Sequence, residues 1–138
     1  MGASVTVADI AGSSIFRDHF PGLKAYIKLV SSTQIRNMAT VAGNFTNASP
    51  IGDLTIFFLA LKASVILNNG NAQRQLKLAD FYKGYKLLDK LPGEFIERIL
   101  FELPGNHDLF NFEKVCKRTH LDIASVNAAI NLKMQDDV

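Results

Sequence analysis

The sequence predicts an α+β fold in which the strands are mainly antiparallel. Residues 126–134 alternate apolar and polar side chains, the pattern of a strand with one dry and one wet face. Asn69-Gly70, a turn signal typical of β-hairpins, stands between strand-like segments at residues 64–67 and 74–78. Apolar residues three and four positions apart in residues 21–30 predict a helix that packs one face on a core.

The other elements follow from local signals along the chain. Residues 3–6 form a short extended segment, and Thr6 or Ser4 is expected to cap a helix from about residue 7. Pro21 suits the first turn of the helix at residues 21–30. Asp53 begins an apolar helix that runs to about residue 63. Its inward residues should be Leu54, Phe57, Phe58 and Leu61, and the remaining elements are a helix at 13–19, a helical turn at 79–82, a loop with a basic bias at 83–93, and strands at 95–103 and 110–117.

Composition and charge exclude several functions. The 138 residues carry a formal charge of +2 with no basic tract, so we expect neither nucleic acid nor a membrane as a partner. Cys116 is the single cysteine, so the chain holds no internal disulfide and no iron–sulfur cluster. The most apolar stretch, residues 54–67, contains Lys62 and is shorter than the ~20 residues of a membrane span. We recognise no signal peptide and expect a cytoplasmic protein.

A polar, glycine-containing segment leads into the helix at Asp53 and is the first candidate for a ligand site. Gly43 and Gly52 let a ligand approach the backbone, and successive amides at residues 43–46 could bind an anion. Asp53 would repel a phosphate, so we expect phosphates near Gly43 and ligand hydroxyls at Asp53. A plain strand-to-helix connection with an Asp cap remains an open alternative. The short donors and acceptors expected on this loop are Thr40, Asn44, Thr46, Asn47 and Ser49.

The same region resembles a known family. Residues 32–44, STQIRNMATVAGN, and residues 48–54, ASPIGDL, are similar to the signature of flavin domains in molybdenum hydroxylases. This family includes xanthine dehydrogenase, aldehyde oxidase and carbon monoxide dehydrogenase. Agreement continues in order over nearly the whole chain, from Gly2-Ala3 to Asp122-Ile123-Ala124. The resemblance implies that FAD is the cofactor.

The resemblance also implies roles for individual residues. The family's pyrophosphate-binding stretch falls on residues 40–43, where Ala42 replaces the usual glycine and adds a methyl group. Asp53 would accept from flavin hydroxyls, Lys114 would lie near the isoalloxazine ring, and a residue at about Ile96 would shield that ring. Arg36 would hold the loop. The implied cofactor-binding set is Thr40, Val41, Ala42, Gly43, Asn44, Thr46, Asn47, Asp53, Ile96 and Lys114.

Domain organisation and partners are further implications of the resemblance. Residues 1–104 would be the second subdomain of the FAD-binding domain, and residues 105–138 the beginning of the C-terminal subdomain. A preceding subdomain with a second phosphate loop would be absent, so weak or no FAD binding is expected of the isolated chain. Electrons would pass from 2Fe-2S clusters to FAD and on to NAD or another acceptor. The clusters and the molybdenum cofactor would belong to partner subunits or domains, and a homo-oligomer is left open.

Two other functions fit parts of the sequence. A non-catalytic interaction module that kept the fold is the main alternative, favoured by Ala42 and by the absent first subdomain. Asn106-His107-Asp108 resembles one fragment of a metallophosphoesterase signature, but the further Asp and His ligands of that chemistry are missing. We interpret His120 as a surface residue that bonds a loop Asp and Cys116 as a small core residue.

Overall fold

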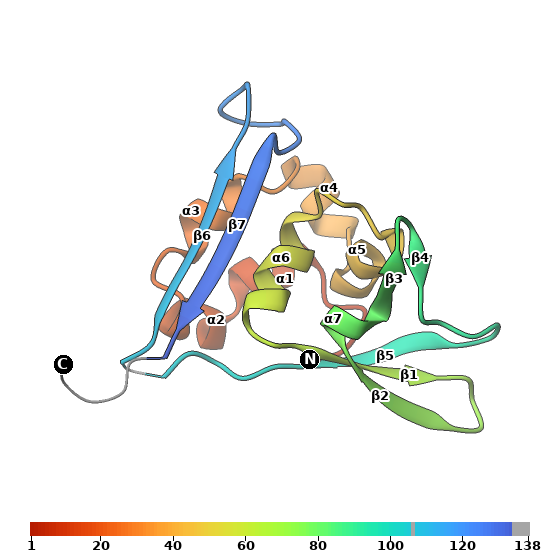
Figure 1. Cartoon of the computed structure of the whole chain (residues 1–138). Helices are drawn as coiled ribbons and strands as arrows, with labels where there is room; N and C mark the ends of the chain where they lie inside the picture. Colours follow the sequence, from red (N-terminus) through yellow and green to blue (C-terminus); the bar gives the residue numbers. More distant parts are fainter. Residues whose placement is uncertain (106, 134–138) are drawn as a thin grey trace.

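The computed structural model describes residues 1–105 and 107–133. Helices fill the middle of the molecule, with the β6–β7 hairpin on one side and a three-stranded sheet on the other (Figure 1). The helices are α1 (Val7–Gly12), α2 (Ser14–His19), α3 (Leu23–Lys28), α4 (Thr33–Met38), α5 (Val41–Asn47), α6 (Asp53–Ala60) and α7 (Leu78–Phe81). The strands are β1 (Ser64–Asn68), β2 (Gln73–Lys77), β3 (Tyr82–Gly84), β4 (Leu87–Leu88), β5 (Phe95–Leu100), β6 (Leu109–Val115) and β7 (Val126–Leu132).

All strand pairs in the described residues are antiparallel, which confirms the α+β prediction. The sheets have the orders β2-β1-β5, β3-β4 and β6-β7. The β1–β2 hairpin turns at Gly70 and Asn71. The backbone N–H of Asn69 closes the turn by donating to the Ala72 carbonyl at 3.3 Å. Gly70 has φ +90°, a conformation that glycine adopts without the steric cost of a Cβ. Residues 3–6 form no strand; the chain makes isolated bridges only at Gly2, with Arg98, and at Thr6, with Thr40.

Helix caps set the start of the helical layer. Thr6 accepts from the Asp9 amide at 3.1 Å while Asp9 accepts from the Thr6 amide at 2.8 Å, a capping box that confirms the expected start of α1. The helix expected at residues 21–30 is shorter, and Pro21 precedes it instead of lying in its first turn, since Gly22 is the N-cap of α3. Pro21 fixes the backbone φ angle just before the helix, and Leu23, the first residue of α3, donates its backbone N–H to the Phe20 carbonyl at 2.9 Å.

The segment expected as a loop between residues 31 and 53 contains two helices, so that expectation is wrong. Ser32 caps α4 and Thr40 caps α5, each accepting from the amide three residues later. The hydroxyl side chains satisfy amides that a helix start leaves unpaired, which stabilises helices of only six and seven residues. α5 ends at Ala48, whose φ of 48° turns the chain toward α6.

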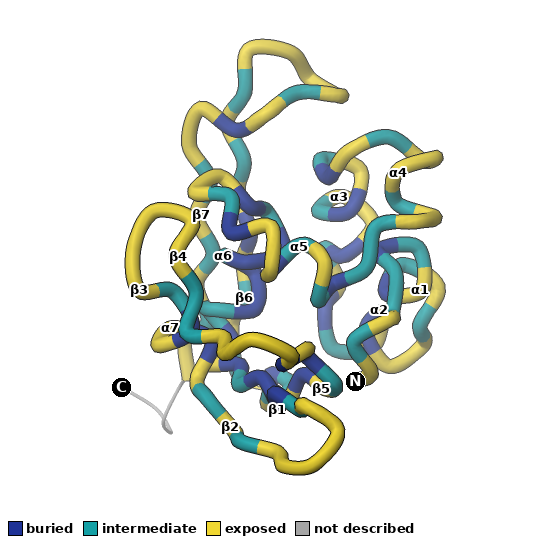
Figure 2. Tube along the Cα trace, turned by 90° about the vertical axis from the view of Figure 1, so that its right-hand side faces the viewer, coloured by how far each residue is buried: buried dark blue, intermediate teal, exposed yellow. Residues whose placement is uncertain are grey.

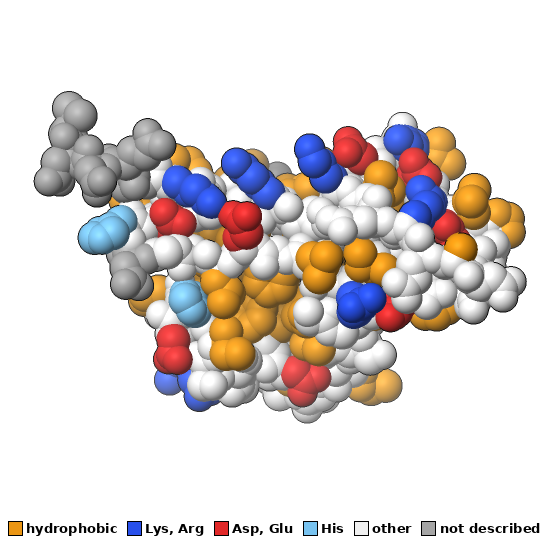
Figure 3. All heavy atoms as spheres, turned by 90° about the horizontal axis from the view of Figure 1, so that it is seen from below, with side chains coloured by type: hydrophobic (Ala, Val, Ile, Leu, Met, Phe, Trp, Pro, Cys, Tyr) orange, Lys and Arg blue, Asp and Glu red, His pale blue; other side chains and the backbone are white. Residues whose placement is uncertain are grey.

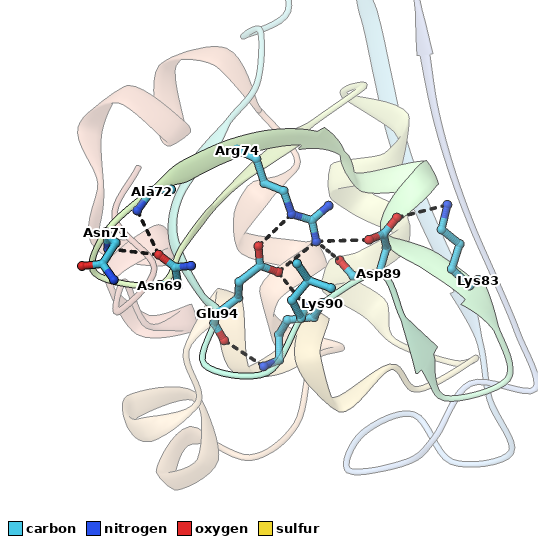
Figure 4. A network of polar contacts seen from close by, with 9 residues as sticks. Asn69, Asn71, Ala72, Arg74, Lys83, Asp89, Lys90 and Glu94 are labelled. Carbon is cyan, nitrogen blue, oxygen red and sulfur yellow. Dashed lines mark hydrogen bonds and ion pairs between the residues drawn. The ribbon is translucent and has the colours of Figure 1, made fainter.

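Residues 83–93, expected as a basic loop, instead contain most of the β3–β4 sheet. Arg74 on β2 joins this segment to the hairpin (Figure 4): its Nε donates to Glu94 Oε1 at 2.7 Å and its Nη2 to Asp89 Oδ1 at 3.1 Å. Lys83 lies 3.2 Å from the same aspartate. The hydrogen bond from Arg74 is the main reason that the pKa of Glu94 falls from 4.5 to about 2. Arg74 and Lys83 are thus paired with carboxylates, whereas Lys86 and Lys90 donate to the backbone carbonyls of Asn47 and Glu94.

The β6–β7 hairpin exposes the face that we expected to be dry. Val126, Ile130 and Leu132 are 63%, 50% and 46% exposed, whereas the polar residues between them point inward. The register explains the inversion, because Asn127 and Asn131 lie opposite Lys114 and Phe110 on the inner face. Large aromatic side chains from β6 already fill the space against the helices. Met134, the last residue of the expected strand, lies outside the described residues.

The core is built on phenylalanine and lies between the helices and the two outer sheets. Figure 2 shows buried segments around α6, β6 and β1, with exposed chain at the β1–β2 turn and beyond β6. Phe57 on α6 lies 4.7 Å from Phe110 on β6, and Phe20 lies 4.9 Å from the same ring, measured between centroids. The predicted inward residues of α6, Leu54, Phe57, Phe58 and Leu61, are all buried, as expected.

An apolar hollow of about 340 Å³ opens between α2 and β5. Ile15 and Leu100, both on its rim, are 58% and 40% exposed. Figure 3, which views the molecule from below, shows hydrophobic side chains gathered in the middle of the face and charged ones around them. This hollow contains none of the residues that the sequence nominated for cofactor binding.

Candidate functional site

A cavity of about 550 Å³ lies where α4, α5 and α6 meet β6 and the loop that follows it. Asn44 and Asn47 on α5, Ser49 and Asp53 before and at the start of α6, and Lys114 on β6 contribute its polar lining. The rim is formed by residues 121–124 with Arg118. Four of the predicted site residues therefore share one cavity: Asn44, Asn47, Asp53 and Lys114.

Asp53 and Lys114 form a buried ion pair in this cavity. Lys114 Nζ lies 2.7 Å from Asp53 Oδ2, and the two side chains are 3% and 11% exposed. The same ammonium donates to the Leu29 carbonyl at 2.8 Å. Asn127 Nδ2 donates to Asp53 Oδ1 at 3.0 Å. Lysine has three N–H donors and a carboxylate has about four acceptor sites, so both groups keep capacity for a ligand.

The amides of the Thr40–Gly43 stretch are already engaged. Val41 and Ala42 donate to the Val5 and Ala3 carbonyls at 2.9 and 3.4 Å, and Gly43 donates to Thr40 Oγ1 at 3.0 Å. Asn44 donates to the Thr40 carbonyl at 3.0 Å, and residues 45 and 46 lie within α5. The expectation that the amides of residues 43–46 bind an anion is therefore wrong, because the cap and the helix engage them. Gly43 is required for another reason, because a Cβ there would lie 2.8 Å from Thr40 Oγ1. Because glycine has no Cβ, the Thr40 hydroxyl can stay in its capping position.

Three further residues of the predicted site, Val41, Asn44 and Thr46, differ in how much of each is available to a ligand. Val41 is fully buried in the core, so only its backbone could contact a ligand. Thr46 donates to the Ala42 carbonyl at 2.9 Å within α5. Asn44 accepts from Thr55 Oγ1 at 3.3 Å while it lines the cavity, which links α5 to α6.

Gly43 and Asp53 lie on the same side of the molecule. Asn44, the residue after Gly43, lines the cavity together with Asp53, and α5 packs against α6. Gly52 is buried, and a Cβ there would lie 2.9 Å from Thr55 Oγ1, so the tight turn into α6 depends on glycine. The hypothesis of a continuous binding surface from Gly43 to Asp53 is compatible with this arrangement.

Ile96 lies outside the cavity, and Arg36 has a structural role. Ile96 is on β5, 5% exposed, opposite Leu67, and lines a separate hollow with Gly2 and Val5. The structure therefore does not bring Ile96 to the cavity of Asp53. Arg36 donates from Nη1 to the carbonyls of residues 30 and 31 at 2.8 and 2.7 Å, which confirms its role in holding the loop before α4.

The metallophosphoesterase-like fragment, His120 and Cys116 were given no part in the candidate site by the sequence analysis. Within residues 1–105 and 107–133, no three metal-ligating side chains come together. His107 and His120 are exposed, and Asn106 lies outside the described residues. Cys116 is half-buried just after β6, not in the core as expected, and donates to the Arg118 carbonyl. None of the described helices has the length and hydropathy that a membrane crossing requires.

Sequence reasoning assigned no site role to Asn127 or to the rim of the cavity, although residues 122–124 of the rim belong to the family resemblance. Asn127 belongs to the alternating strand, where it was counted only as part of a wet face. The rim is shaped by Asp122, which accepts from the Arg118 amide at 2.9 Å, a bond that lowers the pKa of this carboxyl. Alternation gave no signal for Asn127, because it reports which residues share a face and not what that face meets. The rim lies outside the alternating strand.

Residues 1–104 match the family model described as the FAD binding domain in molybdopterin dehydrogenase. The chain belongs to this family. It is 31% identical over 139 residues to the nicotinate dehydrogenase FAD-subunit of Eubacterium barkeri, a match that covers 99% of this chain and 47% of that subunit. It is 31% identical over 134 residues to the glyceraldehyde dehydrogenase medium chain of Sulfolobus acidocaldarius, covering 96% and 47%.

The solved structures agree with the family membership. A reconstituted CO dehydrogenase from Oligotropha carboxidovorans superposes with a TM-score of 0.89 at 27% identity, over 99% of this chain and 47% of that one. The chain thus spans about half the length of these three relatives. The predicted resemblance to flavin domains of molybdenum hydroxylases is confirmed, and with it the α+β fold.

Proposed function

We propose that this chain forms one wall of the FAD site in a molybdenum hydroxylase and binds the cofactor at the cavity between α5, α6 and β6. The observation that carries the proposal is the buried pair of Asp53 and Lys114, held 2.7 Å apart at the cavity wall. Burying two charges is costly unless they are well paired, and a folded chain gains little from it. Because this pair forms part of the wall of a cavity with further polar side chains, we infer that a ligand binds there.

The residues fit a ligand that carries hydroxyls beside a ring with hydrogen-bond acceptors. Asp53 accepts hydrogen bonds from ligand hydroxyls, and the remaining N–H of Lys114 donates to a ring oxygen or nitrogen. Asn44 and Asn47 offer amide donors and acceptors to the part of the cofactor that leads toward Gly43. In this proposal Thr40, Ala42, Gly43 and Thr46 line the pyrophosphate path with their accessible surfaces, because the amides of residues 41–43 are engaged within the protein. Val41, fully buried, supports this stretch from the core.

FAD, when bound, supplies the redox chemistry by accepting and passing on electrons. In the proposed assembly, which resembles xanthine dehydrogenase, electrons arrive from 2Fe-2S clusters and leave to NAD or another acceptor in the cytoplasm. The clusters and the molybdenum cofactor belong to partner subunits or domains. Relatives named for nicotinate and for glyceraldehyde are each 31% identical to this chain. This supports a flavin-binding unit that is common to enzymes with different substrates.

A chimeric subunit tests the proposal. In it, this chain replaces the matched segment of the Eubacterium barkeri FAD subunit, so that the unmatched half of the relative completes the cofactor site. We expect the purified chimeric subunit to retain FAD, with a flavin absorbance spectrum, and the isolated chain to bind FAD much more weakly. Asp53→Ala should lower the FAD affinity of the chimeric subunit by about tenfold or more, the change that a charged hydrogen-bond acceptor typically carries.

Asp18→Ala is the matched control, because Asp18 lies exposed on α2, away from the cavity. It should leave FAD affinity unchanged. A folded but colourless chimeric subunit, or an equal effect of both substitutions, would contradict the proposal. It would favour the alternative of an interaction module that retains the fold.

A further inference from the structure

Asn127 contacts the proposed site without lining it. It lies on β7 directly opposite Lys114 on β6, and both side chains point to the inner face of the hairpin. Its Nδ2 donates to Asp53 Oδ1 at 3.0 Å, while Lys114 Nζ donates to Asp53 Oδ2 at 2.7 Å. Asp53 and Lys114 are part of the cavity wall and Asn127 is not. The hydrogen bond to Asp53 therefore connects Asn127 to the cavity.

Two donors on different oxygens determine the plane of a carboxylate. A single bond from Lys114 would hold one oxygen and leave rotation about the Cβ–Cγ bond, which is broad for aspartate. The second bond, from Asn127, removes that freedom. The orientation of the Asn127 amide follows from the same contact, because a carboxylate accepts and only the NH2 side of the amide donates.

The absence of charge on Asn127 preserves the charge balance of the Asp53–Lys114 pair. Lys114 and Asp53 carry opposite charges and balance each other within the buried pair. A second cation on β7 would leave a net positive charge beside the cavity and draw electron density from the carboxylate. An amide donor orients Asp53 while the carboxylate keeps its charge for ligand hydroxyls.

We propose that Asn127 is a positioning residue for the flavin site, which holds the Asp53 carboxylate in the plane that accepts hydrogen bonds from the cofactor's hydroxyl groups. This inference rests on the proposed FAD site. It adds a residue from the second predicted segment, 105–138, to a site whose motif lies in residues 40–53. It also assigns a role to a polar side chain on the face that strand alternation had marked as wet.

A double-mutant cycle in the chimeric subunit tests the inference, with FAD affinity measured by quenching of flavin fluorescence. Asn127→Leu keeps the side-chain size and removes the donor, and it should lower FAD affinity by about tenfold. In the Asp53→Ala background the same substitution should change affinity by less than about twofold, because the residue through which it acts is gone. A purely structural role predicts the same loss in both backgrounds.

Asn131→Leu is the matched control. Asn131 lies four residues along β7 on the same inner face, opposite Phe110, and does not bond Asp53. It should leave FAD affinity unchanged. Asn127→Ser, which retains a shorter donor, should recover part of the loss, and urea midpoints of all variants check that each one folds.

The outcomes distinguish a failure of the Asn127 role from a failure of the proposed FAD site. If Asp53→Ala weakens FAD binding and Asn127→Leu does not, the positioning role is overturned and the flavin site stands. If Asn127→Leu acts equally with and without Asp53, the residue is structural and the inference is again wrong. If Asp53→Ala itself has no effect, both proposals fall together.

Discussion

Replacing Lys114 by methionine gives the sharpest test of the buried pair in the isolated chain. The substitution keeps the length of the side chain and removes the ammonium, so the bonds to Asp53 and to the Leu29 carbonyl are both lost. Asp53, only 11% exposed, then keeps one neutral donor, Asn127. Breaking a buried ion pair costs about 3–5 kcal/mol, and the remaining donor argues for the lower end, about 3 kcal/mol.

Urea denaturation followed by far-UV circular dichroism measures this change. With a slope of about 1.5 kcal/mol per molar urea for a small protein, the midpoint for Lys114→Met should fall by about 2 M. The double variant Asp53→Asn with Lys114→Met should be more stable than Lys114→Met alone, because no unpaired charge remains buried. Non-additivity of this kind is the signature of a direct interaction.

Lys133→Met is the matched control for a surface pair. Lys133 lies 2.8 Å from Glu102, but the two side chains are 56% and 78% exposed. Water screens such a pair, so its loss should cost less than about 1 kcal/mol. The reasoning is refuted if Lys114→Met and Lys133→Met shift the midpoint equally, or if Asp53→Asn worsens the effect of Lys114→Met.

Three further predictions concern stability. The pKa of Glu94 is lowered from 4.5 to about 2, so the contribution of its bond with Arg74 is complete above pH 4.5 and is lost as the pH falls to about 2; the difference in urea midpoint between the native chain and Glu94→Gln should shrink over that range. Phe58→Ala, at a fully buried ring, should cost about 3–5 kcal/mol, measured by thermal denaturation. Gly70→Ala should cost about 1 kcal/mol from its backbone alone, since φ is +90° and nothing lies near the added Cβ; hydrogen exchange at the hairpin checks this.

Local chemistry made much of the fold predictable. The Thr6 cap, the Asn69-Gly70 turn and the inward stripe of the helix at Asp53 are each determined by a few neighbouring residues, and the structure confirms all three. These signals depend on hydrogen bonds and steric limits within one turn of chain, which the sequence displays directly.

The errors occurred where tertiary packing decides. The segment with Ser32 and Thr40 is an exception, because its two hydroxyls are local helix caps that its many small polar residues led us to interpret as part of a loop. The strand from Val126 was assigned correctly, but its faces were inverted, because Phe110 and Phe112 on the paired strand already fill the inner side. Alternation defines two faces and does not say which one meets the core.

The candidate site was predictable only through resemblance. Asp53 and Lys114 are 61 positions apart, and no periodicity in the sequence connects them. Asn44 and Asn47 share their cavity as the motif implied, whereas Ile96 lies in a different hollow. Asn127 carried no motif at all and became visible only when the ladder placed it opposite Lys114.

The aromatic contacts across the predicted boundary near residue 104 have a consequence for unfolding. Phe110 packs on Phe20 and Phe57, and Tyr26 donates to Asn111 Oδ1 at 3.2 Å, so the hairpin shares its hydrophobic interior with the helices. A two-stranded hairpin is marginally stable by itself in water. The two sequence segments should therefore melt in one cooperative transition, and a protease that cuts between them should release no independently folded fragment.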